Sequence, residues 1–531
     1  MGKDYPYNKV KHVRDIKEMM EYIGEKYAKE TAFWYTIGGK QISVNYEQVK
    51  KDVFALASYF YSIDVKNAKI ALYSENSYEW IVTYLAAVIG SNIIVPLDKE
   101  LKPAEAATLY RACDADMLVY SEKKSALTEE FAEGELKHSL CLSNFADAAA
   151  KGEAMLCQTG ILENEIDVEA PCSIIYTSGT TGTPKGVMLC QRNLISDMIR
   201  SLETLRIPKG TVAVLPFNHT FGFMACVLCQ MHIGSPVYIN AGLKYVLHDI
   251  NIAKPSHISV VPLFIDSFYK GIWKNAKKSG KDKALKALIK TSNAMRKVGI
   301  DMRKKLFKSV IDAFGGNLEM IITGGAPISN EMIKAFDDLG IKIINGYGIS
   351  ECSPIVSINR DKWIKLGSVG QHINTVQVKT INNNEDGEGE ICVKGDIVML
   401  GYYNNPEANA DVFFEDGWFK TGDIGKVDED GFVYITGRKK NLIILENGKN
   451  VYPEELEYLI GNIDGVDEVL VYAEDGYITA EIYAEDMTKK DAITESIKTT
   501  LNSSVAAYKQ IRKIKFRASE FEKTTTKKIK R

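Results

Sequence analysis

The loop of residues 174–186, with the sequence IIYTSGTTGTPKG, combines residue types that bind phosphate. Three glycines let the backbone turn tightly and bring N–H groups close to an anion, five serine and threonine side chains add donors, and Lys185 adds a positive charge. The lysine follows a proline and precedes a glycine, so the order differs from the G-x-x-x-x-G-K-[ST] loop of common NTPases. A flexible surface loop would not normally end in a Pro-Lys-Gly turn directly after a buried-strand pattern. We therefore expect this loop to cradle phosphate groups.

Two further segments, residues 322–327 (ITGGAP) and 345–351 (NGYGISE), each follow an apolar strand pattern. In open α/β sheets, ligands bind at the carboxyl ends of the strands, which is where these segments lie. Glycines let a flat ring approach the backbone, Tyr347 can stack on such a ring, and Glu351 offers a hard oxygen ligand for Mg²⁺. Either segment alone is also typical of an ordinary strand–turn–helix connection.

Three other stretches carry polar side chains suited to chemistry. His219 lies between aromatic residues at the end of a predicted strand, although a single histidine is more often structural than catalytic. Asp423 closes the run WFKTGD of residues 418–423. The chain ends in EKTTTKKIKR, residues 522–531, where a basic tail without fixed structure is the plain alternative.

Residues 176–186, YTSGTTGTPKG, closely resemble the signature loop of the adenylate-forming enzymes, which include acyl-CoA synthetases, peptide-synthetase adenylation domains and luciferases. The similarity runs from this loop to Arg531 and is weaker over the first third of the chain. It implies that the loop binds the phosphates of ATP and that Lys185 and Thr181 act in catalysis, with Thr181 also near the metal. The implied loop contacts are Thr177, Ser178, Gly179, Thr180, Thr181, Gly182 and Lys185.

The resemblance also assigns residues to the nucleoside. Residues 322–327 and 345–351 together resemble the adenine site and the G-Y-G-x-[ST]-E motif of the family, with Glu351 as the Mg²⁺ ligand. Asp423 is assigned to the ribose hydroxyls, a role that a fixed carboxylate fills with two accepted hydrogen bonds, and Arg438 to the same nucleotide. The implied adenine-site residues are Gly324, Gly325, Ala326, Asn345, Gly346, Tyr347, Gly348 and Ser350.

The C-terminal residues resemble the family's closing motif, P-K-T-x-x-G-K-I-x-R. Glu522 stands in place of the proline and Lys527 in place of the glycine. By alignment Lys528 is the catalytic lysine, and Lys527 is a competing candidate. Lys440 occupies the position of the family's hinge between domains, and Gly448 lies on the side that would face the thiol acceptor.

The segment around His219 bears on the substrate. In the family an aromatic-x-His segment lines the site of the substrate carboxylate, so the resemblance makes His219 an active-site residue. Peptide-synthetase domains carry an aspartate in this segment that pairs with the α-ammonium of an amino acid. Asn218 and His219 offer no such anion, which favours a plain carboxylic acid. Residues 261–273 look like the equivalent segment of long-chain acyl-CoA synthetases.

These resemblances imply a fatty acyl-CoA synthetase. Such a ligase converts a long- or medium-chain fatty acid and ATP, with Mg²⁺, to acyl-AMP and pyrophosphate, and then passes the acyl group to the thiol of coenzyme A. One alternative passes the acyl group to the phosphopantetheine of an acyl carrier protein, and the sequence does not separate the two because both thiols share the pantetheine arm. A second alternative is a nucleotide-binding protein without turnover, suggested by the departures at Glu522 and Lys527.

Composition bounds the class of protein. The 531 residues are too many for one ordinary core and predict at least two domains. The formal net charge of −3 argues against a dedicated nucleic-acid binder. No apolar run reaches the roughly 18 to 20 residues of a membrane span, and the first residues lack the apolar core of a signal peptide. Nine scattered cysteines suit a reducing compartment, so we expect a cytoplasmic protein in which Cys226 and Cys229 are buried thiols and not metal ligands.

The segment of residues 274–308 is strongly basic. It holds thirteen Lys or Arg residues against only Asp282 and Asp301, with apolar residues interspersed. A basic helical segment with an apolar stripe either rests on anionic lipid, which would make the protein membrane-associated, or is a solvated helical face.

The pattern of the chain predicts the scaffold. Helical periodicity at residues 13–27 and 49–60 precedes a βαβ rhythm between residues 69 and 344, which predicts doubly wound, mainly parallel sheets covered on both faces. From residue 377 hairpin patterns follow, with turns at Asp386-Gly387 and Asp430-Gly431, and we expect a small β-barrel-like region there. We predict a large α/β domain over residues 1–439 and a small, mobile α+β domain over residues 440–531.

Overall fold

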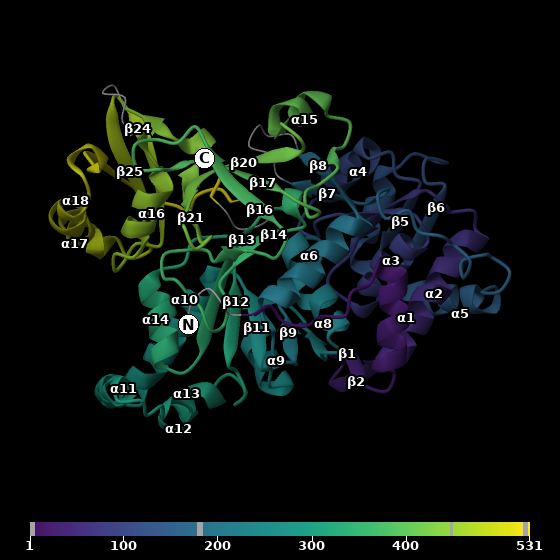
Figure 1. Cartoon of the computed structure of the whole chain (residues 1–531), viewed down its shortest axis with the longest axis horizontal. Helices are drawn as coiled ribbons and strands as arrows, with labels where there is room; N and C mark the ends of the chain where they lie inside the picture. Colours follow the sequence, from purple (N-terminus) through teal and green to yellow (C-terminus); the bar gives the residue numbers. More distant parts are fainter. Residues whose placement is uncertain (1–5, 178–183, 446–449, 524–528) are drawn as a thin grey trace. The chain divides into compact units, whose positions relative to one another are not determined.

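The computed structural model describes residues 6–177, 184–445, 450–523 and 529–531 of the chain (Figure 1). The chain divides into two compact units, Met1–Gln377 with Lys394–Asp411, and Val378–Val393 with Val412–Arg531. The second unit contains the predicted C-terminal domain and also the hairpin strands that precede it. The hinge at Lys440 remains a prediction.

A nine-stranded sheet with a parallel centre forms one half of the first unit. Its parallel strands β9 to β13 are joined by helical crossovers, and the hairpin β1–β2 adds to one edge, where β1 runs parallel to β10. In spatial order the strands are β15 (Gln371–His372), β14 (Ile355–Ile358), β13 (Lys342–Gly348), β12 (Met320–Thr323), β11 (His257–Val260), β9 (Thr211–Ala213), β10 (Val237–Ile239), β1 (Thr31–Ile37) and β2 (Lys40–Asn45).

A seven-stranded sheet forms the other half of the first unit and includes both strands that flank the predicted phosphate loop. Strands β3 to β7 pair in parallel, whereas β7 and β8 form an antiparallel hairpin and β18 pairs antiparallel with β8. In spatial order the strands are β18 (Gly401–Tyr402), β8 (Lys185–Cys190), β7 (Pro171–Thr177), β4 (Ile93–Pro96), β3 (Lys69–Tyr73), β5 (Met117–Tyr120) and β6 (His138–Cys141).

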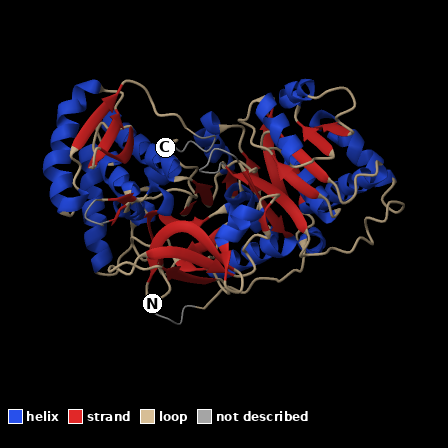
Figure 2. Cartoon of the chain, turned by 90° about the horizontal axis from the view of Figure 1, so that it is seen from above, coloured by secondary structure: helices blue, strands red, loops and turns tan. Residues whose placement is uncertain are grey.

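Helices flank the strands of both sheets (Figure 2). Asn45, Ser77 and Ser329 cap α2, α3 and α14 by accepting hydrogen bonds from N–H groups of the first turn. In the core of the nine-stranded sheet, Ile321 packs with Phe268 of α10 and Phe336 of α14. The helices of the first unit are α1 (Ile16–Lys26), α2 (Tyr46–Ser62), α3 (Tyr78–Ile89), α4 (Pro103–Ala112), α5 (Phe145–Ala154), α6 (Gln191–Thr204), α7 (Thr220–Phe223), α8 (Cys229–His232), α9 (Val246–Ala253), α10 (Pro262–Lys278), α11 (Asp282–Lys297), α12 (Arg303–Leu306), α13 (Lys308–Asp312), α14 (Asn330–Asp338) and α15 (Pro406–Val412).

The second unit combines hairpins with a small α+β layer around its own core, in which Leu456 and Ile460 of α16 pack with Val471 and Ile482 of the sheet. Its strands are β16 (Gln377–Ile381), β17 (Gly389–Lys394), β19 (Phe413–Phe414), β20 (Trp418–Val427), β21 (Val433–Arg438), β22 (Ile443–Ile444), β23 (Asn450–Val451), β24 (Glu468–Glu474), β25 (Tyr477–Tyr483) and β26 (Lys513–Arg517). Its helices are α16 (Pro453–Gly461), α17 (Lys490–Glu495) and α18 (Asn502–Ser504), with a π-helical turn (Ser496–Leu501) between the last two.

The structure confirms the predicted α/β fold class, with sheets that are mainly parallel in the first unit and a smaller C-terminal unit. Both hairpin turns also form, with Gly387 and Gly431 in the left-handed region at φ +75° and +80°. Cys226 and Cys229 are buried as expected, on a helical segment. Among the described residues, no helix is both long enough and apolar enough to cross a membrane.

Candidate active site

The predicted phosphate loop connects the antiparallel strands β7 and β8. Thr177 at the end of β7 lies opposite Lys185 at the start of β8, and the Thr177 hydroxyl donates a hydrogen bond to the Lys185 carbonyl at 3.4 Å. The hairpin therefore fixes both ends of the loop. The predicted loop contacts Ser178, Gly179, Thr180, Thr181 and Gly182 lie outside the described residues.

Tyr402 connects Lys185 to Glu351. The Lys185 ammonium lies over the Tyr402 ring, 4.9 Å from its centre, and the Tyr402 hydroxyl donates a hydrogen bond of 2.9 Å to Oε1 of Glu351. Burial, together with the nearby Glu351 carboxylate, raises the pKa of Tyr402, so the phenol stays protonated and remains a donor. No local sequence pattern indicates Tyr402 as a site residue. Its position depends on β18 pairing with β8, in which Tyr402 lies opposite Val187.

The two glycine-containing segments lie side by side, because the strands that they follow are neighbours in the sheet. Thr323 of β12 pairs with Asn345 of β13, and a Cβ atom on Gly324 would be 3.2 Å from the Gly346 carbonyl oxygen. A Cβ atom on Gly346 would lie 2.8 Å from the Ser357 oxygen of β14, too close for any side chain. These glycines therefore allow close backbone packing, which leaves a flat strip of backbone at this edge of the sheet.

The residues around that strip differ in burial and in their hydrogen bonds. Asn345 is buried, and its amide donates to the Ser368 carbonyl at 2.9 Å and accepts from Asn359 at 2.7 Å, so this amide holds the loops together. Tyr347 is partly exposed on β13, and Gly325 and Ala326 are exposed after β12. The Ser350 hydroxyl is 3.3 Å from that of Thr220, which links the strip to the histidine segment.

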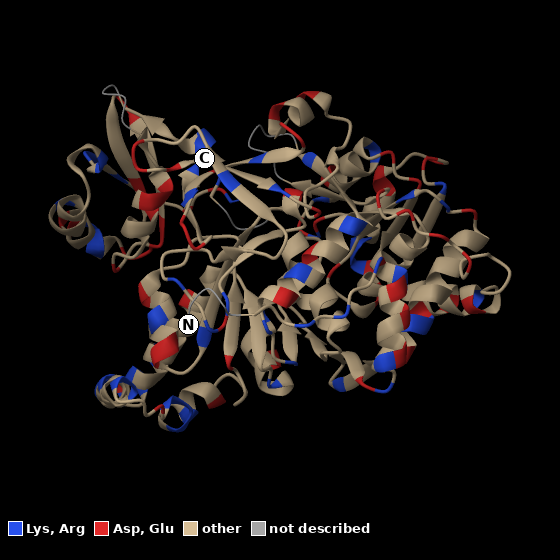
Figure 3. Ribbon diagram, in the orientation of Figure 1, with Lys and Arg blue, Asp and Glu red and all other residues tan. Residues whose placement is uncertain are grey.

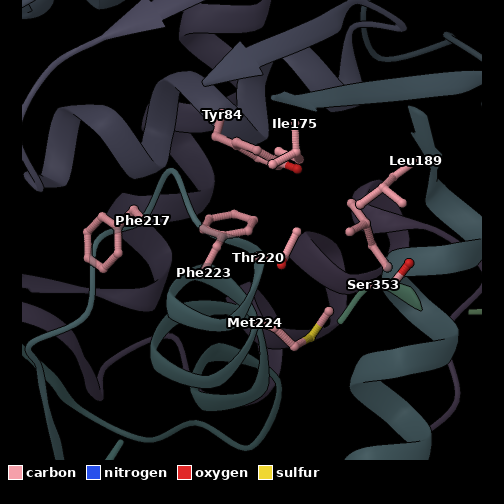
Figure 4. Close-up of a pocket in the computed structure, with 9 residues that line it drawn as sticks. Tyr84, Ile175, Leu189, Phe217, Thr220, Phe223, Met224 and Ser353 are labelled. Atoms are coloured by element: carbon pink, nitrogen blue, oxygen red, sulfur yellow. The ribbon is translucent and has the colours of Figure 1, made fainter. Parts of the chain in front are cut away.

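His219 faces a carboxylate. Its Nε2 lies 3.8 Å from Oδ2 of Asp98, a residue just after β4 that the sequence analysis did not single out. Phe217 and Thr220, which flank this histidine in the sequence, line a small apolar cavity of about 10 Å³ (Figure 4). The residues lining the cavity are Tyr84, Ile175, Leu189, Leu194, Phe217, Thr220, Phe223, Met224 and Ser353.

In the second unit, Asp423 and Arg438 face each other across β20 and β21. Nε of Arg438 lies 3.0 Å from Oδ1 of Asp423, and the Asp423 side chain is only 4% exposed. The ion pair holds the carboxylate in place, and the backbone N–H of Asp423 donates to the Thr421 hydroxyl at 3.1 Å. Partial burial of its ammonium lowers the pKa of Lys440, and the positive charges of Arg438 and Arg531 lower it further. The residue as a whole is nevertheless exposed.

The end of the chain folds back on itself in its described residues. Lys523 bridges Ile529 in antiparallel fashion, and the Lys530 N–H donates to the Glu522 carbonyl at 2.8 Å. The Arg531 guanidinium pairs with Glu457 at 2.6 Å. The loose basic tail considered in the sequence analysis is thus anchored on both sides of residues 524–528. The catalytic candidates Lys527 and Lys528 lie outside the described residues, as does Gly448.

Glu351 is a candidate metal ligand among the described side chains. Within residues 6–177, 184–445, 450–523 and 529–531, no group of three or more His, Cys, Asp and Glu side chains is close enough together to hold a metal ion. Glu351 is an isolated carboxylate with a fixed orientation. It can contribute one ligand to a metal ion whose other ligands are waters or groups of a bound substrate.

Comparisons with known proteins show what the chain is similar to. The family model described as AMP-binding enzyme matches residues 20–403. The long-chain-fatty-acid–CoA ligase FadD15 of Mycobacterium bovis is 30% identical over 73% of this chain and 68% of its own length. The chloroplastic long-chain-fatty-acid–[acyl-carrier-protein] ligase AEE15 of Arabidopsis thaliana is 25% identical over 94% of this chain and 80% of its own. The fold is similar to that of o-succinylbenzoate CoA synthetase of Bacillus subtilis in complex with an acyl-adenylate intermediate, with a TM-score of 0.75, 21% identity and coverage of 97% of this chain and 96% of that one.

Proposed function

Because this chain belongs to the AMP-binding enzymes, a family of adenylate-forming acid–thiol ligases, we propose that it activates a long- or medium-chain fatty acid with ATP and transfers the acyl group to coenzyme A. In the first step a carboxylate oxygen forms a bond to the α-phosphorus of ATP, and the bond from that phosphorus to the bridging oxygen of pyrophosphate breaks. In the second step the thiol sulfur bonds to the acyl carbon, its proton passes to solvent, and AMP leaves.

The observation that carries the proposal is the row of Lys185, Tyr402 and Glu351 at the end of the phosphate loop. Negative charge on the phosphate oxygens is redistributed when pyrophosphate leaves, and a fixed cation stabilises that charge without reorganising. Tyr402 holds the ammonium by its ring and the carboxylate by its hydroxyl, so the two charges stay apart instead of forming an ion pair. Lys185 is therefore available to phosphate.

A magnesium ion that arrives with ATP fits this arrangement. Mg²⁺ in nucleotide sites keeps several waters and is bound by one or two carboxylates plus phosphate oxygens. Glu351 supplies one oriented carboxylate, and the described residues offer no larger acidic cluster that would bind a metal by itself. The hydroxyl of Thr181 would add a second protein group.

The apolar cavity is the proposed site of the acyl chain. Its lining includes Thr220, the residue after His219, and His219 would hold the substrate carboxylate, while Tyr84 and Phe223 are among the aromatic side chains of the lining. A cavity of about 10 Å³ has room for roughly one water molecule. A fatty acyl chain therefore requires these aromatic side chains to move when it binds.

The second unit supplies the remaining groups in this proposal. The carboxylate of Asp423, held by Arg438, would accept hydrogen bonds from the ribose hydroxyls, and Lys528 would neutralise charge at the α-phosphate. The departure at Glu522 is compatible with this role, because the residue contributes its carbonyl to the pairing with Lys530, and a proline has the same carbonyl. Of the two departures that suggested a nucleotide-binding protein without turnover, the one at Glu522 therefore does not count against catalysis.

A specific observation supports one alternative acceptor for the acyl group. The similarity to a ligase whose name specifies acyl carrier protein supports transfer to a carrier-bound phosphopantetheine. The deciding experiment measures pyrophosphate release from ATP with fatty acids of graded length, then product formation with CoA and with holo carrier protein. Release that depends on a fatty acid and falls in the Lys185→Ala variant supports the proposal. ATP binding without release for any acid would instead indicate the nucleotide-binding protein.

A further inference from the structure

Helices α10 and α11 form a surface whose positive charge is not balanced by acidic side chains. Of the thirteen basic residues between 274 and 308, Arg296, Arg303, Lys304 and Lys308 are in ion pairs. The other nine are exposed lysines, and no carboxylate in the described part of the chain lies within ion-pair distance of them. They are Lys274, Lys277, Lys278, Lys281, Lys283, Lys286, Lys290, Lys297 and Lys305.

The charge is also concentrated relative to the whole chain. With thirteen basic and two acidic residues, this segment has a net charge of +11, so the rest of the chain must carry −14 to give the total of −3. An anionic surface would attract this segment and, on balance, repel the remainder of the chain. The charge distribution therefore defines one orientation toward such a surface.

The two helices meet at an aromatic groove. Tyr269, Lys270, Trp273, Lys274 and Lys277 line an open hollow along one face of α10. Lys286 of α11 reaches over the Trp273 ring, 5.8 Å from its centre. Lysines 286, 290 and 297 recur at helical spacing on α11, so they continue the basic face beside the groove. Figure 3 shows this basic density on α11 and α12, at the lower edge of the view.

Apolar side chains are exposed at the end of the same surface. Directly after Lys297, Val298 is 74% exposed and Ile300 is 49% exposed. Exposed aliphatic residues at the end of a row of lysines, on a segment whose other helix carries a tyrosine and a tryptophan, have the composition of a surface that contacts the headgroup region of a bilayer.

We propose that the α10–α11 surface binds the face of an anionic lipid bilayer. The lysines and the Trp273 groove lie against headgroup phosphates, and Val298 and Ile300 enter the boundary with the acyl chains. Lysine is a point charge without the fork that grips single phosphates, which suits a diffuse anionic surface better than a nucleic-acid backbone. Exposed valine and isoleucine would also gain nothing from such a backbone. The binding does not depend on catalysis, so it stands or falls separately from the proposed reaction.

The test uses the full chain and sedimentation with vesicles of phosphatidylcholine alone or with about one third phosphatidylserine. We expect binding to the anionic vesicles only, and release as rising salt shortens the screening length. The triple variant Lys283→Gln, Lys286→Gln, Lys290→Gln should lower the partition coefficient about 100-fold. A matched variant that removes three exposed lysines elsewhere, at positions 40, 137 and 151, should change it less than about threefold.

A second variant tests the apolar contact without changing charge. Val298→Ser with Ile300→Ser alters only exposed side chains, so the fold should be kept, and it should increase the sensitivity of vesicle binding to salt. Unchanged unfolding temperatures would show that all three variants fold. The proposal is overturned if the chain does not bind anionic vesicles, or if the two triple variants bind them equally. It is also overturned if the first triple variant loses binding to RNA or to an acidic protein but keeps its binding to vesicles.

Discussion

Replacing Tyr402 by phenylalanine removes one oxygen atom from the centre of the candidate site. The ring under Lys185 is kept, and the hydrogen bond to Glu351 is lost. A hydrogen bond to a charged group contributes about 1.5 to 3 kcal/mol. Each 1.36 kcal/mol lost from transition-state stabilisation lowers the rate about tenfold. If Tyr402 positions Glu351 for catalysis, Tyr402→Phe should therefore reduce kcat/KM for pyrophosphate release by about 10- to 100-fold.

The adjacent residue offers a matched control. Tyr403 also donates its hydroxyl to a carboxylate, that of Asp114 at 2.8 Å, but that contact is exposed. Tyr403→Phe makes the same chemical change one residue away and should leave kcat/KM within about twofold of the wild type.

The assay should follow pyrophosphate release as a function of both ATP and Mg²⁺ concentration. Because Glu351 is proposed to meet the metal, Tyr402→Phe should require more Mg²⁺ for half-maximal activity, whereas Tyr403→Phe should not. A merely structural role would lower the unfolding temperature without changing the Mg²⁺ dependence. Equal kinetics for the two variants would refute the positioning role of Tyr402.

Three further predictions concern other parts of the account. Glu351→Ala should lower pyrophosphate release by two to three orders of magnitude, the scale for one pre-organised contact, and a wild-type rate would remove the proposed metal site. Lys528→Ala should block adenylate formation yet spare thioester formation from supplied acyl adenylate, whereas Gly448→Leu should do the reverse; if neither lysine of the tail is needed for adenylation, its proposed role is wrong. Burial lowers the pKa of His232 and of His257 to about 4 in the folded chain, compared with about 6.5 in the unfolded chain. The contribution of each histidine to the free energy of unfolding is therefore complete above pH 6.5, and it decreases by about 1.4 kcal/mol per pH unit as the pH falls from 6.5 toward 4. Denaturant titrations between pH 6.5 and 5 give the slope of the unfolding free energy against pH. His257→Phe should roughly halve the part of that slope that comes from the two histidines, and an unchanged slope would show that His257 does not titrate in this range.

Local sequence patterns were sufficient to predict most parallel strands of the first unit and both hairpin turns. Those features depend on residues that are close together in the sequence, so their patterns can be recognised without knowing the fold. The hairpin β1–β2 was missed even though Gly38 and Gly39, with positive φ angles, form its turn. Its parallel pairing with β10 joins residues 33 and 237, and no local pattern indicates such a partner.

The same cause explains why two residues of the site were not predicted. Tyr402 reaches Glu351 only because β18 pairs with β8, and Asp98 meets His219 only because two separate strand ends converge. The reverse case is Asn345, whose residue type suits a nucleotide contact but whose amide is used by the loops around it. Residue type and spacing indicate which chemistry is available, whereas the fold decides which groups are left to perform it.

The most direct test of the central claim is pyrophosphate release by the purified chain supplied with MgATP and fatty acids of graded length. The account predicts release that requires a fatty acid, an acyl-AMP intermediate detectable when no thiol is present, and conversion of that intermediate to a thioester when CoA or holo carrier protein is added. ATP bound with no release for any acid, or release that is independent of the acid, would contradict it.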